Sequence, residues 1–129
     1  MKEFSVTLAP RFYETDALGH INNASIAAWF EVVRIRYLES LMDADPRTAR
    51  DWMLASIQID FVAETFYGKD VVAKITGAEV GNSSLNILCE MYQEDRLTIR
   101  GKSVLVYMDT AAKSSVRIPD SLREMIASG

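Results

Sequence analysis

A short polar stretch near the start of the chain holds the residue types best suited to chemistry. Residues 14–23 run Glu-Thr-Asp-Ala-Leu-Gly-His-Ile-Asn-Asn and include the only histidine among 129 residues. A mostly apolar segment with helical spacing follows. The N-terminus of a helix offers unpaired amides and a partial positive charge, which can stabilise a developing oxyanion. Asp16, placed beside that end, could attack a carbonyl carbon or take a proton from water.

The neighbours of Asp16 fit a catalytic and an ordinary structural interpretation. Gly19 would let the backbone turn tightly, and His20 could orient a group or donate a hydrogen bond. Either Asn22 or Asn23 would be the N-cap of the helix. Alternatively, Asp16 is a turn residue bonded to its own backbone, and the others are turn, core and cap residues. On the residues alone the structural interpretation is favoured, because such turns are common.

One helix and a series of strands must position this stretch. Alternation of apolar and polar residues predicts strands over 4–13, 56–66, 70–80, 84–92 and 97–108. Short turn-rich breaks between the later strands favour antiparallel pairing. A helix is predicted over 24–42, apolar around so much of its circumference that it should be enclosed. A short helix with Asp120 as N-cap should lie near the C-terminus.

The lengths of these elements predict how they pack. A helix of about 19 residues and a strand of about nine residues each span roughly 28–30 Å. One twisted antiparallel sheet of about five long strands, wrapped around the central helix, would therefore bury both partners. The predicted fold class is α+β, in a single domain over 1–129, because a chain of 129 residues fits one hydrophobic core.

Composition argues against several classes of partner. A formal net charge of -4 with interleaved signs gives no basic face for nucleic acid. The sequence has neither a run of 18 apolar residues nor a secretory signal. Cys89 is the single cysteine, so the residue set of a structural zinc site is missing. We expect a cytoplasmic protein with no metal, no nucleic-acid partner and no membrane partner.

The polar stretch and the helix after it resemble a known family. An acid followed by Gly-His-Ile-Asn-Asn, then Ala-Ser-Ile-Ala-Ala-Trp-Phe-Glu-Val-Val-Arg, is similar to the 4-hydroxybenzoyl-CoA thioesterase group of the hotdog-fold superfamily. Residues 57–72 resemble that group's second strand and its Tyr-Gly-Asp turn, and residues 117–126 resemble its usual ending. The resemblance covers nearly the whole chain and implies the hotdog fold, which is the arrangement predicted above.

The resemblance also implies a reaction, the hydrolysis of an acyl-CoA thioester to a free acid and CoA. No cofactor is implied, since CoA is part of the substrate. By position the family's catalytic carboxylate falls on Asp16, with His20 as a second catalytic candidate and the helix-start amides polarising the carbonyl. Family members are typically dimers or dimers of dimers, which implies a homodimer or homotetramer. The substrate-binding residues implied or expected are Gly19, Asn22, Asn23, Ala24 and Tyr67.

Two departures from the family and two rival functions remain open. Lys69 is inserted in the Tyr-Gly-Asp turn, and many relatives carry a proline in the segment 62–66, which here contains Glu64 and Thr65. We favour Glu64 as a solvated strand residue over a second acid at the site. A dehydratase or hydratase acting on acyl-CoA would need a histidine base, and the only histidine lies in the motif turn. A non-catalytic acyl-CoA-binding protein would gain nothing from Asp16.

Overall fold

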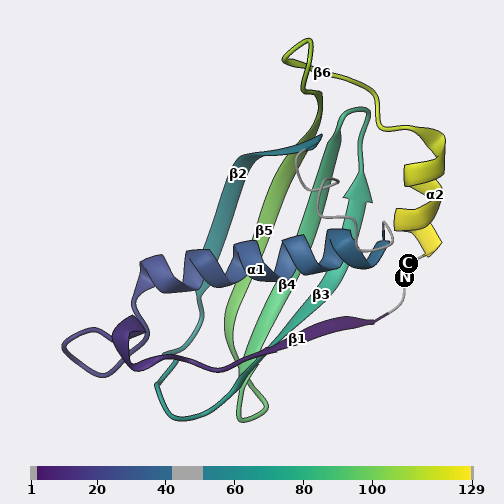
Figure 1. The fold of residues 1–129 in the computed structure, drawn as a ribbon. Coiled ribbons are helices and arrows are strands. Elements are labelled where there is room, and N and C mark those ends of the chain that lie inside the picture. The colour runs from purple at the N-terminus through teal and green to yellow at the C-terminus, as the bar shows by residue number, and fades with distance from the viewer. Residues whose placement is uncertain (1–2, 42–50, 129) are drawn as a thin grey trace.

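The structure, a computed structural model that describes residues 3–41 and 51–128, is organised around one long helix. Helix α1 (Asn23–Leu41) lies across one face of an antiparallel sheet (Figure 1). The long strands of that sheet are β1 (Phe4–Leu8), β2 (Trp52–Phe61), β3 (Val71–Val80), β4 (Ser84–Gln93) and β5 (Arg96–Asp109). A two-residue strand, β6 (Ser114–Ser115), pairs with the end of β5, and α2 (Asp120–Ser128) follows.

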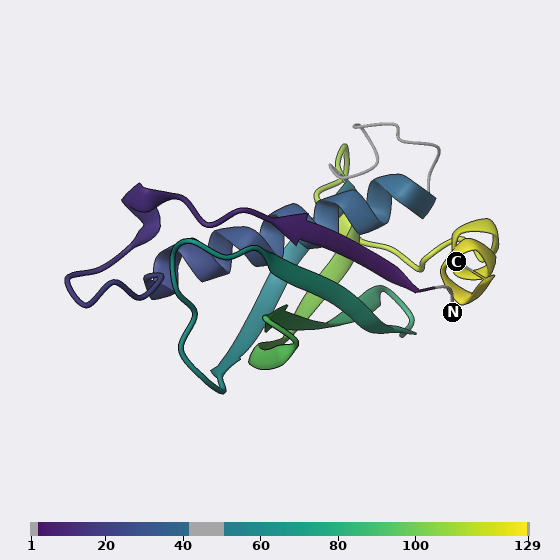
Figure 2. The ribbon, with the colours of Figure 1, turned by 90° about the horizontal axis from the view of Figure 1, so that it is seen from below.

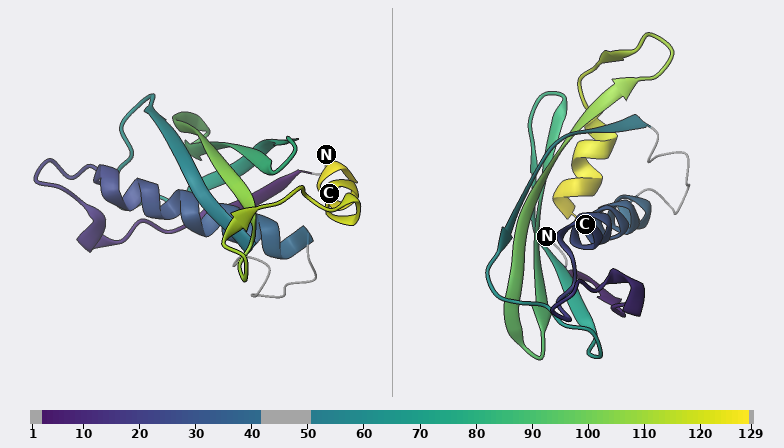
Figure 3. Two further views of the ribbon diagram at one scale, coloured as in Figure 1. Left: turned by 90° about the horizontal axis from the view of Figure 1, so that it is seen from above. Right: turned by 90° about the vertical axis from the view of Figure 1, so that its left-hand side faces the viewer.

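The strand order of the sheet is β1-β3-β4-β5-β2, with every pairing antiparallel. Short turns join β3 to β4 and β4 to β5, as the sequence predicted. The sheet curves around α1, which is clearest where the helix is viewed nearly end-on (Figure 3, right). Figure 2 shows the same helix along its length. The predicted α+β class, with one twisted sheet around a central helix and a short C-terminal helix, is confirmed.

The core lies between α1 and the concave face of the sheet. Alternate residues of β4 are buried along its whole length, as expected for a strand with one face on a core. Phe30 and Val33 of α1 are 2% and 0% exposed. Burying side chains of this size contributes about 1.5–3 kcal/mol each. This packing fixes where the first turn of α1 lies relative to the sheet.

The residue bounds predicted for two of the strands are wrong. The first strand stops at Leu8 instead of Tyr13, because Pro10 has no amide to donate and the chain enters a 3-10 turn (Phe12–Glu14). The second strand begins at Trp52 and ends at Phe61, so the predicted range 56–66 was wrong at both ends. Position 42, predicted to end the helix, lies outside the described residues.

The expectation that α1 is enclosed is wrong for the single chain. The sheet covers one side of the helix, and the opposite side is open, with Val32 39% exposed (Figure 3). Arg34 is only 9% exposed, and burial lowers the pKa of its guanidinium. The helix therefore has more apolar surface than its own sheet can cover.

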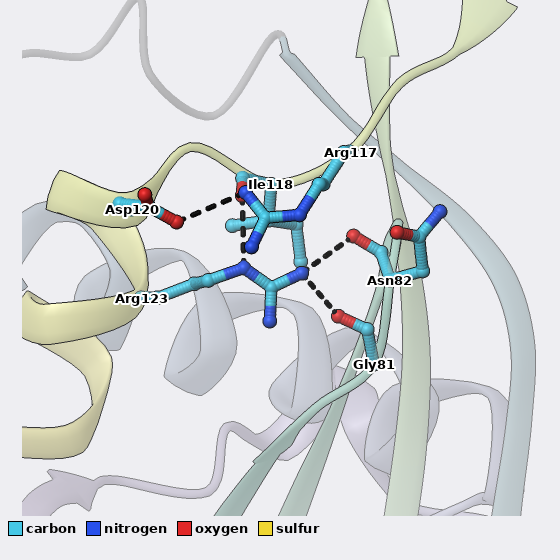
Figure 4. A network of polar contacts seen from close by, with 6 residues as sticks. All are labelled: Gly81, Asn82, Arg117, Ile118, Asp120 and Arg123. Carbon is cyan, nitrogen blue, oxygen red and sulfur yellow. Dashed lines mark hydrogen bonds and ion pairs between the residues drawn. The ribbon is translucent and has the colours of Figure 1, made fainter.

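Helix α2 is attached to the sheet by one arginine (Figure 4). The Arg123 guanidinium donates to the carbonyl oxygens of Gly81 and Asn82 at 2.8 and 2.9 Å, and to that of Ile118 at 2.9 Å. The carbonyls of Gly81 and Asn82 belong to the turn between β3 and β4. Leu122 and Ile126 complete the contact from the buried face of α2. The C-terminal helix is thereby tied to the end of the sheet.

Helix α1 lies very close to the sheet at Gly101, in the middle of β5. A Cβ atom added there would lie 2.5 Å from the Phe30 ring and 2.9 Å from the Gln58 carbonyl oxygen. We expect Gly101→Ala to reduce the free energy of unfolding by about 1–3 kcal/mol, measured by urea denaturation. Gly77→Ala is the control, since its added Cβ meets only the Leu88 side chain at 3.0 Å. Equal stability of Gly101→Ala and the wild type would contradict this packing.

Candidate active site

The loop between β1 and α1 folds into a tight turn that presents Asp16. Thr15 and Ile21 form a β-bridge, and the Asp16 amide donates to the His20 carbonyl at 2.8 Å. The turn closes through Gly19, whose φ of 80° lies in the left-handed region that glycine adopts without strain. The sequence prediction of a glycine turn in front of the helix is confirmed.

The Asp16 carboxylate has one oxygen engaged in the turn. Its Oδ1 accepts hydrogen bonds from the amides of Leu18 at 2.8 Å and His20 at 3.1 Å. Within the described residues no hydrogen bond uses Oδ2, and the side chain is exposed. Asp16 therefore has the structural role in the turn that the sequence suggested, but only one of its two carboxylate oxygens takes part in it. The other oxygen is available for chemistry.

The first turn of α1 is capped by Asn22. The Asn22 Oδ1 accepts from the amide of Ser25 at 2.8 Å, while its Nδ2 donates to the Glu14 carbonyl at 3.0 Å. The side-chain cap is thus Asn22, and Asn23 is the first helical residue. Among the described residues, no hydrogen bond uses the amides of Asn23 and Ala24. These two donors are the free amides that the helix-start hypothesis requires.

A cavity of about 340 Å³ lies where the turn, the start of α1 and the segment after β2 meet. Three of the predicted site residues border it, namely Asp16, His20 and Asn23. The remaining lining comes from the helix and the segment after β2: Ile21, Ile26, Phe61, Val62, Ala63, Glu64 and Thr65. The cavity therefore combines a carboxylate, an imidazole and a helix N-terminus with an apolar wall.

His20 connects the two sides of this cavity. Its Nε2 lies 3.4 Å from Glu64 Oε2, and its ring packs edge-on against Phe66 with centroids 5.0 Å apart. Glu64 had been interpreted as a solvated strand residue. It is exposed, but it lies beyond the end of β2 and borders the cavity, so the strand assignment was wrong. Asp16 and Glu64 consequently line the same cavity, with His20 beside both.

Not every predicted site residue borders the cavity. Gly19 and Asn22 shape the turn and cap the helix, and Ala24 borders a second hollow on the other side of the loop. Tyr67 is 51% exposed and packs edge-on against Phe12, with centroids 5.7 Å apart. Substrate contacts by these residues stay predictions.

Sequence reasoning missed two residues at this site. Thr65 borders the cavity and is only 3% exposed, and its carbonyl accepts from the Ile21 amide at 2.8 Å. Glu14 is buried and accepts a hydrogen bond from the Trp29 ring nitrogen at 2.9 Å. Both contacts join residues at least 15 positions apart, so no local pattern signals them. An acid two positions before Asp16 was the only visible hint.

The described part of the chain offers no metal cluster and no membrane-spanning helix. Within residues 3–41 and 51–128, no three His, Cys, Asp or Glu side chains form a group that could hold a metal ion. None of the helices described is both long and apolar enough to cross a membrane.

A curved antiparallel sheet around one long helix, with a carboxylate turn at the start of that helix, defines the hotdog class of thioesterase folds. Residues 10–126 match the model of the thioesterase-like superfamily, and the chain belongs to that superfamily.

Several solved structures resemble the whole chain, including the following two. A predicted thioesterase from Bacillus stearothermophilus is 29% identical, covers 98% of this chain and 96% of its own, and superposes with a TM-score of 0.90. A thioesterase from Thermus thermophilus, solved in complex with coenzyme A and zinc, is 26% identical with a TM-score of 0.87. That match covers 96% of this chain and 91% of the Thermus chain.

A curated relative matches part of the chain. The uncharacterized protein YsmA of Bacillus subtilis (strain 168) is 32% identical over 77 residues, which is 60% of this chain. The match spans about half the length of that relative, 52%.

The two asparagines at the start of α1 provide a test of the local geometry. Asn22→Ala removes the cap, so we expect it to lower the free energy of unfolding by about 1 kcal/mol. Asn23→Ala should change it by less than about 0.5 kcal/mol, because this side chain is exposed. Urea denaturation of both variants measures the difference. A larger loss for Asn23→Ala would contradict the assignment of the cap.

Proposed function

We propose that this protein is an acyl-CoA thioesterase, hydrolysing an acyl-CoA to a free acid and CoA. One observation carries the proposal: Asp16 and Asn23, the first residue of α1, border the same cavity, and no hydrogen bond among the described residues uses the amides of Asn23 and Ala24. A carboxylate and two free amides are the groups that thioester hydrolysis needs, one to deliver the nucleophile and the others to hold the carbonyl oxygen. Membership of the thioesterase-like superfamily supports the same reaction.

The proposed mechanism begins at the carbonyl oxygen of the thioester. The amides of Asn23 and Ala24 would donate to this oxygen, and the partial positive charge of the helix N-terminus would stabilise it as negative charge develops. Asp16 Oδ2 would either attack the carbonyl carbon, forming an anhydride that water then hydrolyses, or accept a proton from the attacking water. In either route the C–S bond breaks, and CoA leaves as the thiolate and is then protonated. The Asp16 Oδ1 bonds to Leu18 and His20 would hold the carboxylate in place during either step.

The His20 imidazole would donate a hydrogen bond to Glu64 across the cavity. Its Nε2 faces Glu64, which favours a proton on that nitrogen. The backbone amide of His20 also supports Asp16, so the histidine acts on the carboxylate through the backbone and on the cavity through the ring. Glu64 then keeps the imidazole oriented toward the cavity wall.

The substrate class rests on the relatives. Coenzyme A in the Thermus structure supports a CoA ester as the substrate. CoA would enter only as part of the substrate, and no separate cofactor is proposed. The lone buried cysteine supports a reducing compartment, so we retain the cytoplasm as the proposed location.

The exposed edge of the sheet supports a homodimer. Strand β2 is an edge strand that pairs only with β5 among the described strands, and its apolar side chains are unusually open. Met53, Ile57 and Phe61 are 51%, 37% and 49% exposed. A long, exposed edge strand of this kind presents unpaired backbone N–H and C=O groups, which can pair with a strand of another chain. A second copy of β2, antiparallel to the first, would cover it with a two-fold symmetric interface.

That interface would also complete the proposed active site. The cavity wall formed by 61–65 continues directly from β2. A partner strand paired with β2 would therefore lie next to the cavity and narrow its opening. We propose a homodimer as the active form, with further association into a tetramer left as an outcome of the mass measurement below.

The role of Asp16 can be tested by release of CoA thiol from a panel of short-chain, long-chain and aromatic acyl-CoAs. Asp16→Asn keeps an oxygen for the turn bonds but removes the base or nucleophile, so we expect turnover to fall by at least about a hundredfold. Burial raises the pKa of the Cys89 thiol to about 12. Cys89 should therefore react little with the thiol reagent that detects CoA, and the protein itself should add little background signal to the assay.

Asp109→Asn is the matched control for this test. Asp109 Oδ1 accepts from the amides of Ala111 at 3.0 Å and Ala112 at 3.2 Å, in a turn at the far end of β5. Its substitution repeats the chemical change without touching the cavity, so turnover should be unchanged. Equal turnover by Asp16→Asn and the wild type would remove Asp16 from the mechanism. Binding of acyl-CoA without release of thiol would favour a binding protein.

The proposed dimer can be tested by light scattering after size-exclusion chromatography. The wild type should have at least twice the 14.5 kDa chain mass, and Ile57→Lys should shift it to the monomer, because charge on both copies would face the shared edge. Met125→Lys is the control, since Met125 is similarly exposed, at 39%, but lies on α2. A monomeric wild type would refute the dimer, and an Ile57→Lys variant that stays dimeric would place the interface elsewhere.

A further inference from the structure

The Glu14 carboxylate is a deeply buried acid that the mechanism above does not use. Glu14 is 7% exposed and lies two residues before Asp16. Its Oε1 accepts from the backbone amide of Arg11 at 2.7 Å, and its Oε2 accepts from Trp29 Nε1 at 2.9 Å. Each carboxylate oxygen of Glu14 thus accepts a hydrogen bond from an N–H group. A buried carboxylate is costly unless it is bonded in this way, so its presence calls for a reason beyond packing.

The bond to Trp29 joins the loop to the body of the helix. Trp29 is 5% exposed and lies in the second turn of α1, packed in the core. The Glu14 backbone carbonyl accepts from both the amide and the Nδ2 of Asn22, at 2.8 and 3.0 Å. Glu14 therefore connects the base of the Asp16 turn to the helix cap through its backbone and to the helix core through its side chain.

Packing alone does not hold this loop in place. Behind it lies an open hollow of about 760 Å³, bordered by β1, the loop and the outer side of α1. The loop side chains of Phe12, Tyr13 and Leu18 are 74%, 73% and 77% exposed. With solvent on one side and the cavity on the other, the loop depends on its hydrogen bonds to α1. The buried bond between Glu14 and Trp29 is one of these.

We infer that Glu14 is a positioning residue: its bond to Trp29 sets the distance between the Asp16 carboxylate and the free amides of α1. This inference rests on the proposed function, because it concerns the geometry of that reaction. Catalysis of this type is sensitive to displacements of about 1 Å, which can cost about a hundredfold in rate. Loosening the Glu14 contact would move Asp16 relative to the helix while leaving the core intact.

Glu14→Gln is the sharpest probe of this role. Glutamine has the same size but only one acceptor oxygen, so its NH₂ group must face either the Arg11 amide or Trp29 Nε1, both of which are donors. Trp29→Phe removes the donor from the other side and keeps an aromatic ring in the core. We expect Glu14→Gln to lower kcat at least about tenfold with KM changed less than about threefold.

A double-mutant cycle and a stability control separate positioning from general destabilisation. Combining Glu14→Gln with Trp29→Phe should lower kcat no further than the more severe single variant, because both break one bond. Arg123→Met weakens the attachment of α2, far from the cavity. It should leave kcat unchanged while measurably lowering the free energy of unfolding. An unchanged kcat in Glu14→Gln, or an equal loss in Arg123→Met, would overturn the inference.

Hydrogen exchange at single amides tests the same inference without relying on turnover. In Glu14→Gln the amides of Asp16, Gly19 and Ile21, which bond to the carbonyls of His20, Asp16 and Thr65, should exchange faster. The Tyr107 amide in the sheet, bonded to the Ser83 carbonyl, should be unchanged. Unaltered exchange at all three loop amides would overturn the positioning role. A wild type without turnover would refute the thioesterase proposal alone, and exchange would still decide the role of Glu14.

Discussion

Helix α1 packs its apolar stripe into the concave face of the sheet, and this contact places everything at the candidate site. Phe30 lies so close to Gly101 that no side chain fits between them. The contact fixes the helix axis, and with it the position and direction of the first turn. The first turn carries the free amides of Asn23 and Ala24, and the cavity lies beside it. The loop, the cap and the segment after β2 are arranged around this one point.

The site combines a firmly held helix with a more loosely held carboxylate. The amides of Asn23 and Ala24 belong to a helix whose next turns are buried in the core. Asp16 sits on an exposed turn, attached through Oδ1 to its own backbone and through Glu14 to Trp29. One partner in the proposed reaction is thus fixed by packing and the other by hydrogen bonds.

Much of this architecture could be predicted from local sequence signals. The long helix, the antiparallel strands, the Gly19 turn and the polar cap all follow from periodicity and turn chemistry, which act over a few residues. The predicted strands run past the ends of β1 and β2, because alternation continues beyond the point where the chain leaves the sheet, although Pro10 marks that point after β1. The enclosure of α1 was overestimated, since sequence shows how apolar a helix is but not how far its own sheet reaches around it.

The candidate site was predicted only in part, for a similar reason. Asp16, His20 and Asn23 lie within a stretch of eight residues, so one local sequence motif contains all three. Glu64 and Thr65 reach the cavity through tertiary folding, and the Glu14 to Trp29 bond spans 15 positions. No spacing rule links residues that meet only after the sheet has curved around the helix. The contacts that the sequence did not reveal are those that join the Asp16 loop to α1 and to the segment after β2.

A crystal structure with a non-hydrolysable acyl-CoA analogue, with the thioester replaced by an amide, tests the central claim most directly. The account predicts that the carbonyl oxygen lies within hydrogen-bond distance of the Asn23 and Ala24 amides, with Asp16 Oδ2 facing the carbonyl carbon directly or through one water molecule. An analogue whose carbonyl lies away from the start of α1, for example in the hollow beside Trp29, would contradict it.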